Sequence, residues 1–145
     1  MVSKTFVIIK PDAISRGLIG KIISRFEDKF LEIVAIEMKQ KDETWCQLHY
    51  GHLTGDIYLS LEEFMLMGPL IGIVLRGPDA IDTVRRMAGP TNSLSAIPGT
   101  IRGDFGTHPM RYNIVHAAAD SHEAVEREIK LFFGEDCANT ILSKE

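Results

Sequence analysis

The segment TFVIIKPDAISRGLIGKIISRFEDKFLEIVAIEMKQK, residues 5–41, decides the fold that we expect. It begins with a short apolar run that ends at Pro11, which favours a buried strand over a helix. From Gly17 to Phe30 apolar residues recur at helical spacing with basic residues between them, as in an amphipathic helix. Residues 32–41 alternate in polarity and end in charge, which is typical of a half-buried strand. The segment therefore reads as strand, helix and strand.

A second unit with the same order of elements follows. LIGIVLRG, residues 70–77, predicts a third strand, and the next helix stops at Gly89. YNIVH, residues 112–116, predicts a fourth strand, and Asp120 or Ser121 caps a last helix. Two further helical pieces, from Asp42 to about His52 and from Leu59 to Met67, lie between the second and third strands.

Two such units predict an α+β fold, a ferredoxin-like βαββαβ sandwich with a four-stranded antiparallel sheet. Its main helices are expected on one face of the sheet. The other face is then left for ligands, partners or extra helices.

Composition narrows the class of protein. The chain has 145 residues, 45% hydrophobic and 25% charged, which predicts one globular domain over residues 1–145. Its net charge of -4 argues against a general binder of nucleic acids or anionic membranes. Cys46 and Cys137 lie too far apart for a CxxC metal site and predict no disulfide framework. No apolar run has the length of a signal peptide or a membrane span, so we expect a cytoplasmic location.

The segment PTNSLSAIPGTIRGDFGTHPMR, residues 90–111, shows neither a helical nor a strand period. Loops of this length in compact domains are usually functional or disordered. This one contains apolar residues that can anchor it, among them Leu94, Ile97 and Phe105. We interpret it as a binding loop, against the alternative of a packed surface excursion with solvated charges.

His116 stands where the fourth strand ends, and its imidazole is the side chain that changes charge near neutral pH. If residues 112–118 are extended, Ile114, His116 and Ala118 share one face. In the helix that follows, Glu128 interrupts an apolar stripe, and a buried carboxylate needs a partner. That partner is either His116 or a lysine or arginine, unless Glu128 is exposed, and the sequence leaves these options open.

In order and nearly end to end, a series of segments resembles the nucleoside diphosphate kinase family: TFVIIKPD, RGLIGKIISRFEDK, HYGHL, MGPLIGIVLRG, RRMAGPTN, SAIPGTIRGDF and NIVH. The resemblance implies a ferredoxin-like protomer in a hexamer or tetramer. It also implies Mg²⁺-dependent transfer of a γ-phosphoryl group from a nucleoside triphosphate to a histidine and then to a nucleoside diphosphate, with little discrimination of the base.

The resemblance also implies roles for individual residues. His116 matches the phosphorylated nucleophile, and Glu128 matches the carboxylate that orients it. The residues that match phosphate contacts are Lys10, Arg85, Thr91 and Arg102. Tyr50 and Asn113 match residues near the reacting phosphate and the ribose. Asp120 either holds Mg²⁺ through water or simply caps the last helix.

The chain departs from the family pattern in three places. The run HAAADS, residues 116–121, is one residue longer than usual and has alanine where a serine normally bonds near the orienting glutamate. MRYN, before the strand, is also one residue longer. Tyr58, or Ile57 one step earlier, takes the place of a phenylalanine that stacks on the base.

Two further classes of function compete with an active kinase. The change to HAAADS is compatible with a non-catalytic regulatory module that still binds nucleotide. A metal-binding protein is disfavoured, because the five histidines show no ligand spacing typical of zinc.

Overall fold

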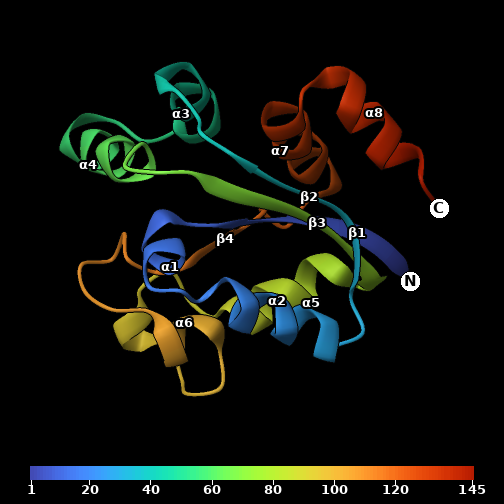
Figure 1. The fold of residues 1–145 in the computed structure, drawn as a ribbon, viewed down its shortest axis with the longest axis horizontal. Coiled ribbons are helices and arrows are strands. Elements are labelled where there is room, and N and C mark those ends of the chain that lie inside the picture. The colour runs from blue at the N-terminus through green and yellow to red at the C-terminus, as the bar shows by residue number, and fades with distance from the viewer.

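Four antiparallel strands form one sheet in the computed structural model of residues 1–145, in the order β2-β3-β1-β4 (Figure 1). The strands are β1 (Val2–Ile9), β2 (Glu32–Lys39), β3 (Leu70–Pro78) and β4 (Val115–Ala117). This order and this pairing confirm the predicted α+β, ferredoxin-like sheet.

Helices cover both faces of the sheet (Figure 1). The helices are α1 (Pro11–Ser15), α2 (Ile19–Asp28), α3 (Glu43–Tyr50), α4 (Gly55–Met65), α5 (Ala80–Ala88), the 3-10 turn η1 (Ser93–Ser95), α6 (Ile101–Phe105), α7 (His122–Phe133) and α8 (Glu135–Ser143). Phe6 and Ile8 of β1 point into a core with α3, α4, α7 and α8, whereas Val7 and Ile9 point into a core with α2 and α5. The two main helices therefore share one face as predicted, and extra helices fill the other face.

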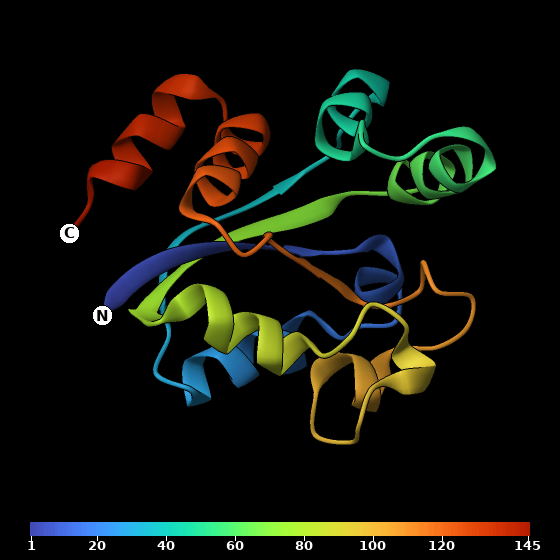
Figure 2. The ribbon, with the colours of Figure 1, turned by 180° about the vertical axis from the view of Figure 1, so that it is seen from behind.

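The segment of residues 90–111 is more regular than the sequence indicated. It contains η1 and α6, and Figure 2 shows it beside the C-terminal end of α5. Thr100 caps α6, since its Oγ1 accepts a hydrogen bond from the Gly103 amide at 3.0 Å. Helices of three and five residues are too short to show a period, which is why the sequence did not predict them.

The fourth strand is shorter than predicted and begins after an unusual residue. Ile114 has a φ of 75°, a left-handed conformation that is strained for a β-branched side chain. Two contacts hold it there: Asp12 Oδ2 accepts from the Ile114 amide at 3.1 Å, and the Lys10 amide donates to the Ile114 carbonyl at 2.9 Å. Ile114 therefore lies in the α2 and α5 core, and the prediction that it shares a face with His116 is wrong.

None of the helices combines the length and the hydropathy of a membrane-crossing segment.

Candidate active site

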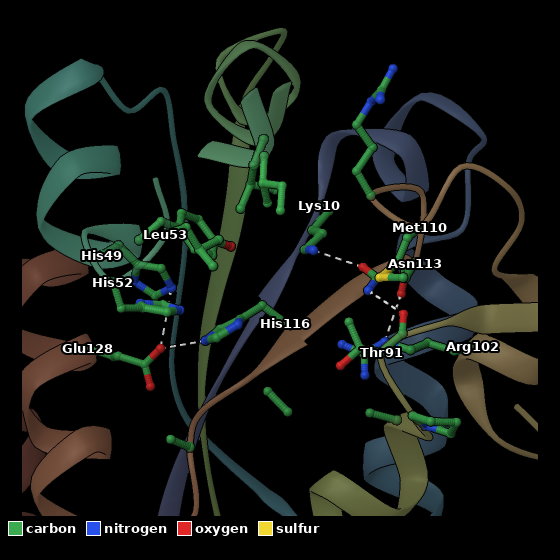
Figure 3. A pocket seen from close by; sticks show the side chains of 18 of the residues that line it. Lys10, His49, His52, Leu53, Thr91, Arg102, Met110, Asn113, His116 and Glu128 are labelled. Carbon is green, nitrogen blue, oxygen red and sulfur yellow. Dashed lines mark hydrogen bonds and ion pairs between the residues drawn. The ribbon is translucent and has the colours of Figure 1, made fainter. Parts of the chain in front are cut away.

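A cavity of about 1000 Å³ lies where β1 ends and β4 begins, between α3, α4 and α7 on one side and the segment of residues 89–113 on the other. Of the ten site residues that the sequence predicted, eight line it: Lys10, Tyr50, Arg85, Thr91, Arg102, Asn113, His116 and Glu128. They come from β4, four helices and the loops between them. The fold thus brings together residues that span most of the chain (Figure 3).

His116 of β4 is held by Glu128 of α7 (Figure 3). The His116 Nε2 lies 2.5 Å from the Glu128 Oε1, and the carboxylate is buried. An ionised carboxylate can only accept, so Nε2 carries the proton and Nδ1 keeps its lone pair. Of the alternatives that the sequence left open, Glu128 therefore pairs with the histidine, and Nδ1 is the available nucleophile.

The cavity keeps this imidazole neutral. Burial lowers the pKa of His116 below its ordinary value, and the nearby cations Lys10 and Arg102 lower it further, against the opposing effect of Glu128. Only the neutral ring has a nucleophilic nitrogen, so the surroundings favour the reactive form at neutral pH.

Lys10, immediately after β1, is the most buried cation in the cavity wall. Its Nζ donates to Asn113 Oδ1 at 2.8 Å, and Asn113 Nδ2 donates to the Thr91 carbonyl at 2.8 Å. Burial lowers the pKa of Lys10 to about 7, with a further contribution from Arg102. A phosphate beside Lys10 would restore its charge, which makes this ammonium a site for an anion.

Arg102 ties the loop to the fourth strand. Its guanidinium donates to the carbonyls of Gly89 at 2.7 Å, Asn113 at 3.2 Å and Val115 at 2.6 Å. A guanidinium has five N–H groups, so two remain for a ligand. Arg85 of α5 stands beside it and donates to the Ala118 carbonyl at 3.1 Å. The two arginines add to each other's positive potential, and together with burial Arg85 lowers the pKa of Arg102 to about 10.

Tyr50 lies beside the imidazole of His116, and the centroids of the two rings are 6.2 Å apart. Its hydroxyl is buried without a hydrogen-bond partner, and burial raises its pKa above the ordinary value. Tyr50 therefore stays protonated and can donate to a ligand.

Two predicted site residues lie elsewhere. Tyr58 donates its hydroxyl to Glu62 Oε2 at 2.5 Å and packs against the core, whereas the neighbouring Ile57 lines the cavity and is 71% exposed. Of these two residues of α4 only Ile57 therefore lines the cavity, because successive helical residues point about 100° apart.

Asp120 is exposed and lines a separate hollow near the N-terminus, so neither of its expected roles matches its position. The N-cap of α7 is Ser121, whose Oγ accepts from the Ala124 amide at 3.1 Å. The prediction that Asp120 holds a metal at this site is not supported by the geometry.

Only one of the two carboxylate oxygens of Glu128 has a hydrogen-bond partner. Glu128 keeps its bond to His116, yet its second oxygen, Oε2, is buried without a hydrogen-bond partner. Ala119 and Ala124 line the same cavity and offer no side-chain donor. Glu128 is thus directed at His116 through one oxygen, while its other oxygen has no donor.

Sequence reasoning missed one neighbour of this pair. His49 of α3 brings its Nε2 to 3.3 Å from Glu128 Oε1. The ligand atoms of His49, His116 and Glu128 lie within 4.8 Å of one another, although their spacing in the sequence suggested no cluster. No signal in the sequence indicated this position, because it depends on how α3 packs against α7.

Comparison with known proteins agrees with this geometry. The family profile described as "Nucleoside diphosphate kinase" matches residues 3–137. Proteins named nucleoside diphosphate kinase from Methanobrevibacter smithii and Methanocaldococcus jannaschii are 49% and 51% identical over 137 and 138 residues. The alignments cover 94% of this chain in both cases and 90% and 96% of the relatives.

Solved structures agree as well. A halophilic nucleoside diphosphate kinase from Halobacterium salinarum in complex with CDP has a TM-score of 0.88 at 40% identity, with 94% of this chain and 91% of the other covered. A transition state mimic of the Borrelia burgdorferi enzyme with bound vanadate and ADP has a TM-score of 0.85 at 36% identity, with 94% and 89% covered. With a matching profile over nearly its whole length, the chain belongs to the nucleoside diphosphate kinase family.

Proposed function

We propose that this protein transfers the γ-phosphoryl group of a nucleoside triphosphate to a nucleoside diphosphate by a ping-pong mechanism through phosphorylated His116. One observation carries the proposal: the imidazole is bound through Nε2 to Glu128, so Nδ1 is free in a cavity whose wall includes Lys10, Arg85 and Arg102.

In the first half-reaction, the lone pair of His116 Nδ1 attacks the γ-phosphorus and forms an N–P bond. The bond from that phosphorus to the oxygen bridging to the β-phosphate breaks, and the nucleoside diphosphate leaves with the electron pair. In the second half-reaction, a terminal oxygen of the acceptor diphosphate attacks phosphorus and the electron pair returns to Nδ1. One phosphate site serves donor and acceptor in turn.

The chain's own groups supply position and charge. Glu128 stabilises the positive charge that the ring acquires on phosphorylation, because it is already bound to Nε2. Lys10 and the free N–H groups of Arg102 and Arg85 neutralise the oxygens of the transferred phosphoryl group. Asn113 fixes Lys10 at 2.8 Å and lies where the resemblance places the ribose.

The nucleoside is proposed to lie against the apolar part of the cavity lining, which includes Leu53, Ile57, Leu61 and Met110. Aliphatic contact offers no donor or acceptor that would distinguish bases, which supports broad base specificity.

Mg²⁺ is proposed to accompany the nucleotide, where it neutralises the phosphate oxygens when bound. The only carboxylates that line the cavity are Asp56 and Glu128, and Glu128 is bound to His116. The cavity therefore suits an ion held mainly by phosphates and water rather than by a protein cage.

We further propose that the enzyme is a cytoplasmic homo-oligomer, a hexamer or a tetramer. Free thiols at Cys46 and Cys137 support a reducing compartment. The oligomer is supported by the apolar edge of β2, where Ile36 and Met38 are about half exposed.

The direct test uses γ-³²P-labelled ATP and Mg²⁺. The protein should acquire an acid-labile, base-stable label that chases onto added GDP, and His116→Ala should acquire none. His122→Ala is the matched control, since this exposed histidine of α7 lies outside the cavity and should leave labelling unchanged. Nucleotide binding without label would instead indicate the non-catalytic regulatory module and contradict the proposal.

A further inference from the structure

His49 is an imidazole buried against the reacting pair that the mechanism above does not use. Its side chain is only 1% exposed, and its ring stacks on Trp45 with a centroid distance of 4.7 Å and an interplanar angle of 22°. The edge-to-face contact with His116 has a centroid distance of 4.7 Å. The stack fixes the plane of the His49 ring, so its nitrogens have a defined direction.

The polar groups around His49 are incompletely paired. Its Nε2 is 3.3 Å from Glu128 Oε1, but the alignment is too poor for a hydrogen bond, and Nδ1 has no partner either. Glu128 Oε2 is also unpartnered. A buried carboxylate with a single donor is costly, and catalytic hydrogen bonds that are loose without ligand commonly tighten in the substrate complex.

The charge state of His49 suits a donor that adds no charge. Burial, with the neighbouring cationic groups as lesser causes, lowers the pKa of His49 to about 2. The ring therefore stays neutral and has one N–H to offer. A charged ring here would compete with His116 for the carboxylate, whereas a neutral ring does not.

We propose that His49 is a positioning residue for phosphoryl transfer: in the substrate complex the 3.3 Å contact tightens, and Nε2–H then donates to Glu128 Oε1 and keeps the carboxylate directed at Nε2 of His116. The inference rests on the proposed function, because it gives a role to Glu128 in the phosphorylation of His116. It also accounts for how Glu128 stays in place although Ala119 and Ala124 offer it no hydroxyl.

A metal ion is a poorer explanation for the same three side chains. Oε1 already lies at 2.5 Å from one Nε2 and 3.3 Å from the other, so the oxygen occupies the space between the two rings. Metal ligands instead surround a position about 2.0–2.2 Å from each of them.

The test compares two substitutions in single-turnover labelling of His116 by γ-³²P-ATP. His49→Phe keeps an aromatic ring on Trp45 but removes the N–H, and should slow labelling about tenfold while the nucleotide dissociation constant stays unchanged. His49→Gln retains an amide N–H near the position of Nε2 and should restore most of the rate. Equal rates for the wild type and His49→Phe, or equal losses in both variants, would overturn the inference.

A double-mutant cycle distinguishes positioning from a general structural role. In a Glu128→Gln background, His49→Phe should cost little additional rate, because the residue acts through the carboxylate. The same fold-loss in both backgrounds would refute the inference.

A measurement on the unmodified protein is independent of how well the variants fold. ¹H–¹⁵N NMR of the imidazoles should find His49 as the Nε2–H tautomer. An Nδ1–H tautomer would contradict the inference. In the labelling experiment with γ-³²P-ATP, absence of any label on the wild type would instead refute the proposed function itself.

Discussion

In the proposed mechanism His116 attacks only while its ring is neutral, and the cavity lowers the pKa of that ring through burial and neighbouring cations. The rate of phosphorylation should therefore fall with decreasing pH only below the ordinary histidine value of about 6.5. Glu128→Gln removes the group that opposes this shift, so it should lower the pKa of His116 further. An NMR titration of the imidazole checks both statements, and a midpoint above 6.5 would contradict the first.

Lys10 gives a second dependence on pH, this time of stability. Its pKa in the folded chain is about 7, against 10.5 for the exposed side chain. Below pH 7 the folded protein must bury the charged form of Lys10, which costs free energy. Between pH 7 and 10.5 the side chain keeps its proton in the unfolded chain but not in the folded one. The contribution of Lys10 to the free energy of unfolding therefore rises with pH in this window. The penalty is fully present below pH 7 and is lost above 10.5.

Lys10→Met removes this buried charge. The variant's free energy of unfolding should exceed that of the wild type by the largest amount below pH 7, and this difference should decline steadily toward pH 10.5. Phosphoryl transfer by the variant should be strongly impaired at every pH. Urea denaturation of both proteins at several pH values measures the difference. A difference that does not change with pH would show that Lys10 is not titrating in this range.

At the scale of elements, the turn before α6 depends on a close approach of two backbones. A Cβ on Gly103 would lie 1.9 Å from the Ile97 carbonyl oxygen, so Gly103→Ala forces the chain apart next to Arg102. We expect a loss of about 1–3 kcal/mol in the free energy of unfolding and a higher KM for nucleotides. Gly20→Ala is the control, since its Cβ meets nothing within 4 Å and alanine favours the helix. Equal stability of the two variants would contradict the argument.

In the proposed function, helix α4 supplies a side chain that contacts the base. Ile57 lines the cavity without an aromatic ring, so Ile57→Phe should add stacking of about 0.5–1.5 kcal/mol and lower the KM for nucleoside diphosphates several-fold. Tyr58→Phe should leave the KM unchanged, because that ring is directed at Glu62. Steady-state kinetics with purine and pyrimidine diphosphates checks both. A changed KM in Tyr58→Phe but not in Ile57→Phe would mean that Tyr58 contacts the base.

How far the sequence predicts these elements depends on their length. The ten-residue amphipathic helix α2 and the apolar strands β1 and β3 have clear periods, and the predicted strands and order are confirmed. Short helices such as α6 depend on caps and tertiary packing instead of a period. The C-terminal α8 was not predicted; it follows α7 at Gly134, which has a φ of 87°.

Some residues of the site could also be predicted from the sequence, and others could not. The carboxylate that interrupts an apolar stripe pointed to Glu128, and its pairing with His116 is what the structure shows. The position of His49 was not predictable, because it depends on how α3 packs against α7. The left-handed Ile114 was also beyond reach, since it depends on Asp12, more than a hundred residues earlier.

At the scale of the whole molecule, β2 leaves one edge of the sheet open. It pairs only with β3, and Ile36 and Met38 on it are 49% and 53% exposed. An exposed apolar edge strand favours pairing with another strand, and a second copy of β2 related by a two-fold axis supplies an identical apolar edge. The oligomer that we propose is therefore expected to contain β2-to-β2 dimers.

In a two-fold interface a single substitution acts twice, so Met38→Glu should place two like charges close together and reduce the size of the assembly in solution. Light scattering after size exclusion should give a mass of several chains for the wild type and a smaller mass for Met38→Glu. Leu48→Glu is the control: Leu48 is also 53% exposed but belongs to helix α3 and not to the edge strand. A wild type with the mass of a single chain would contradict the oligomer. An assembly that Met38→Glu leaves intact would show that the contact does not involve the β2 edge.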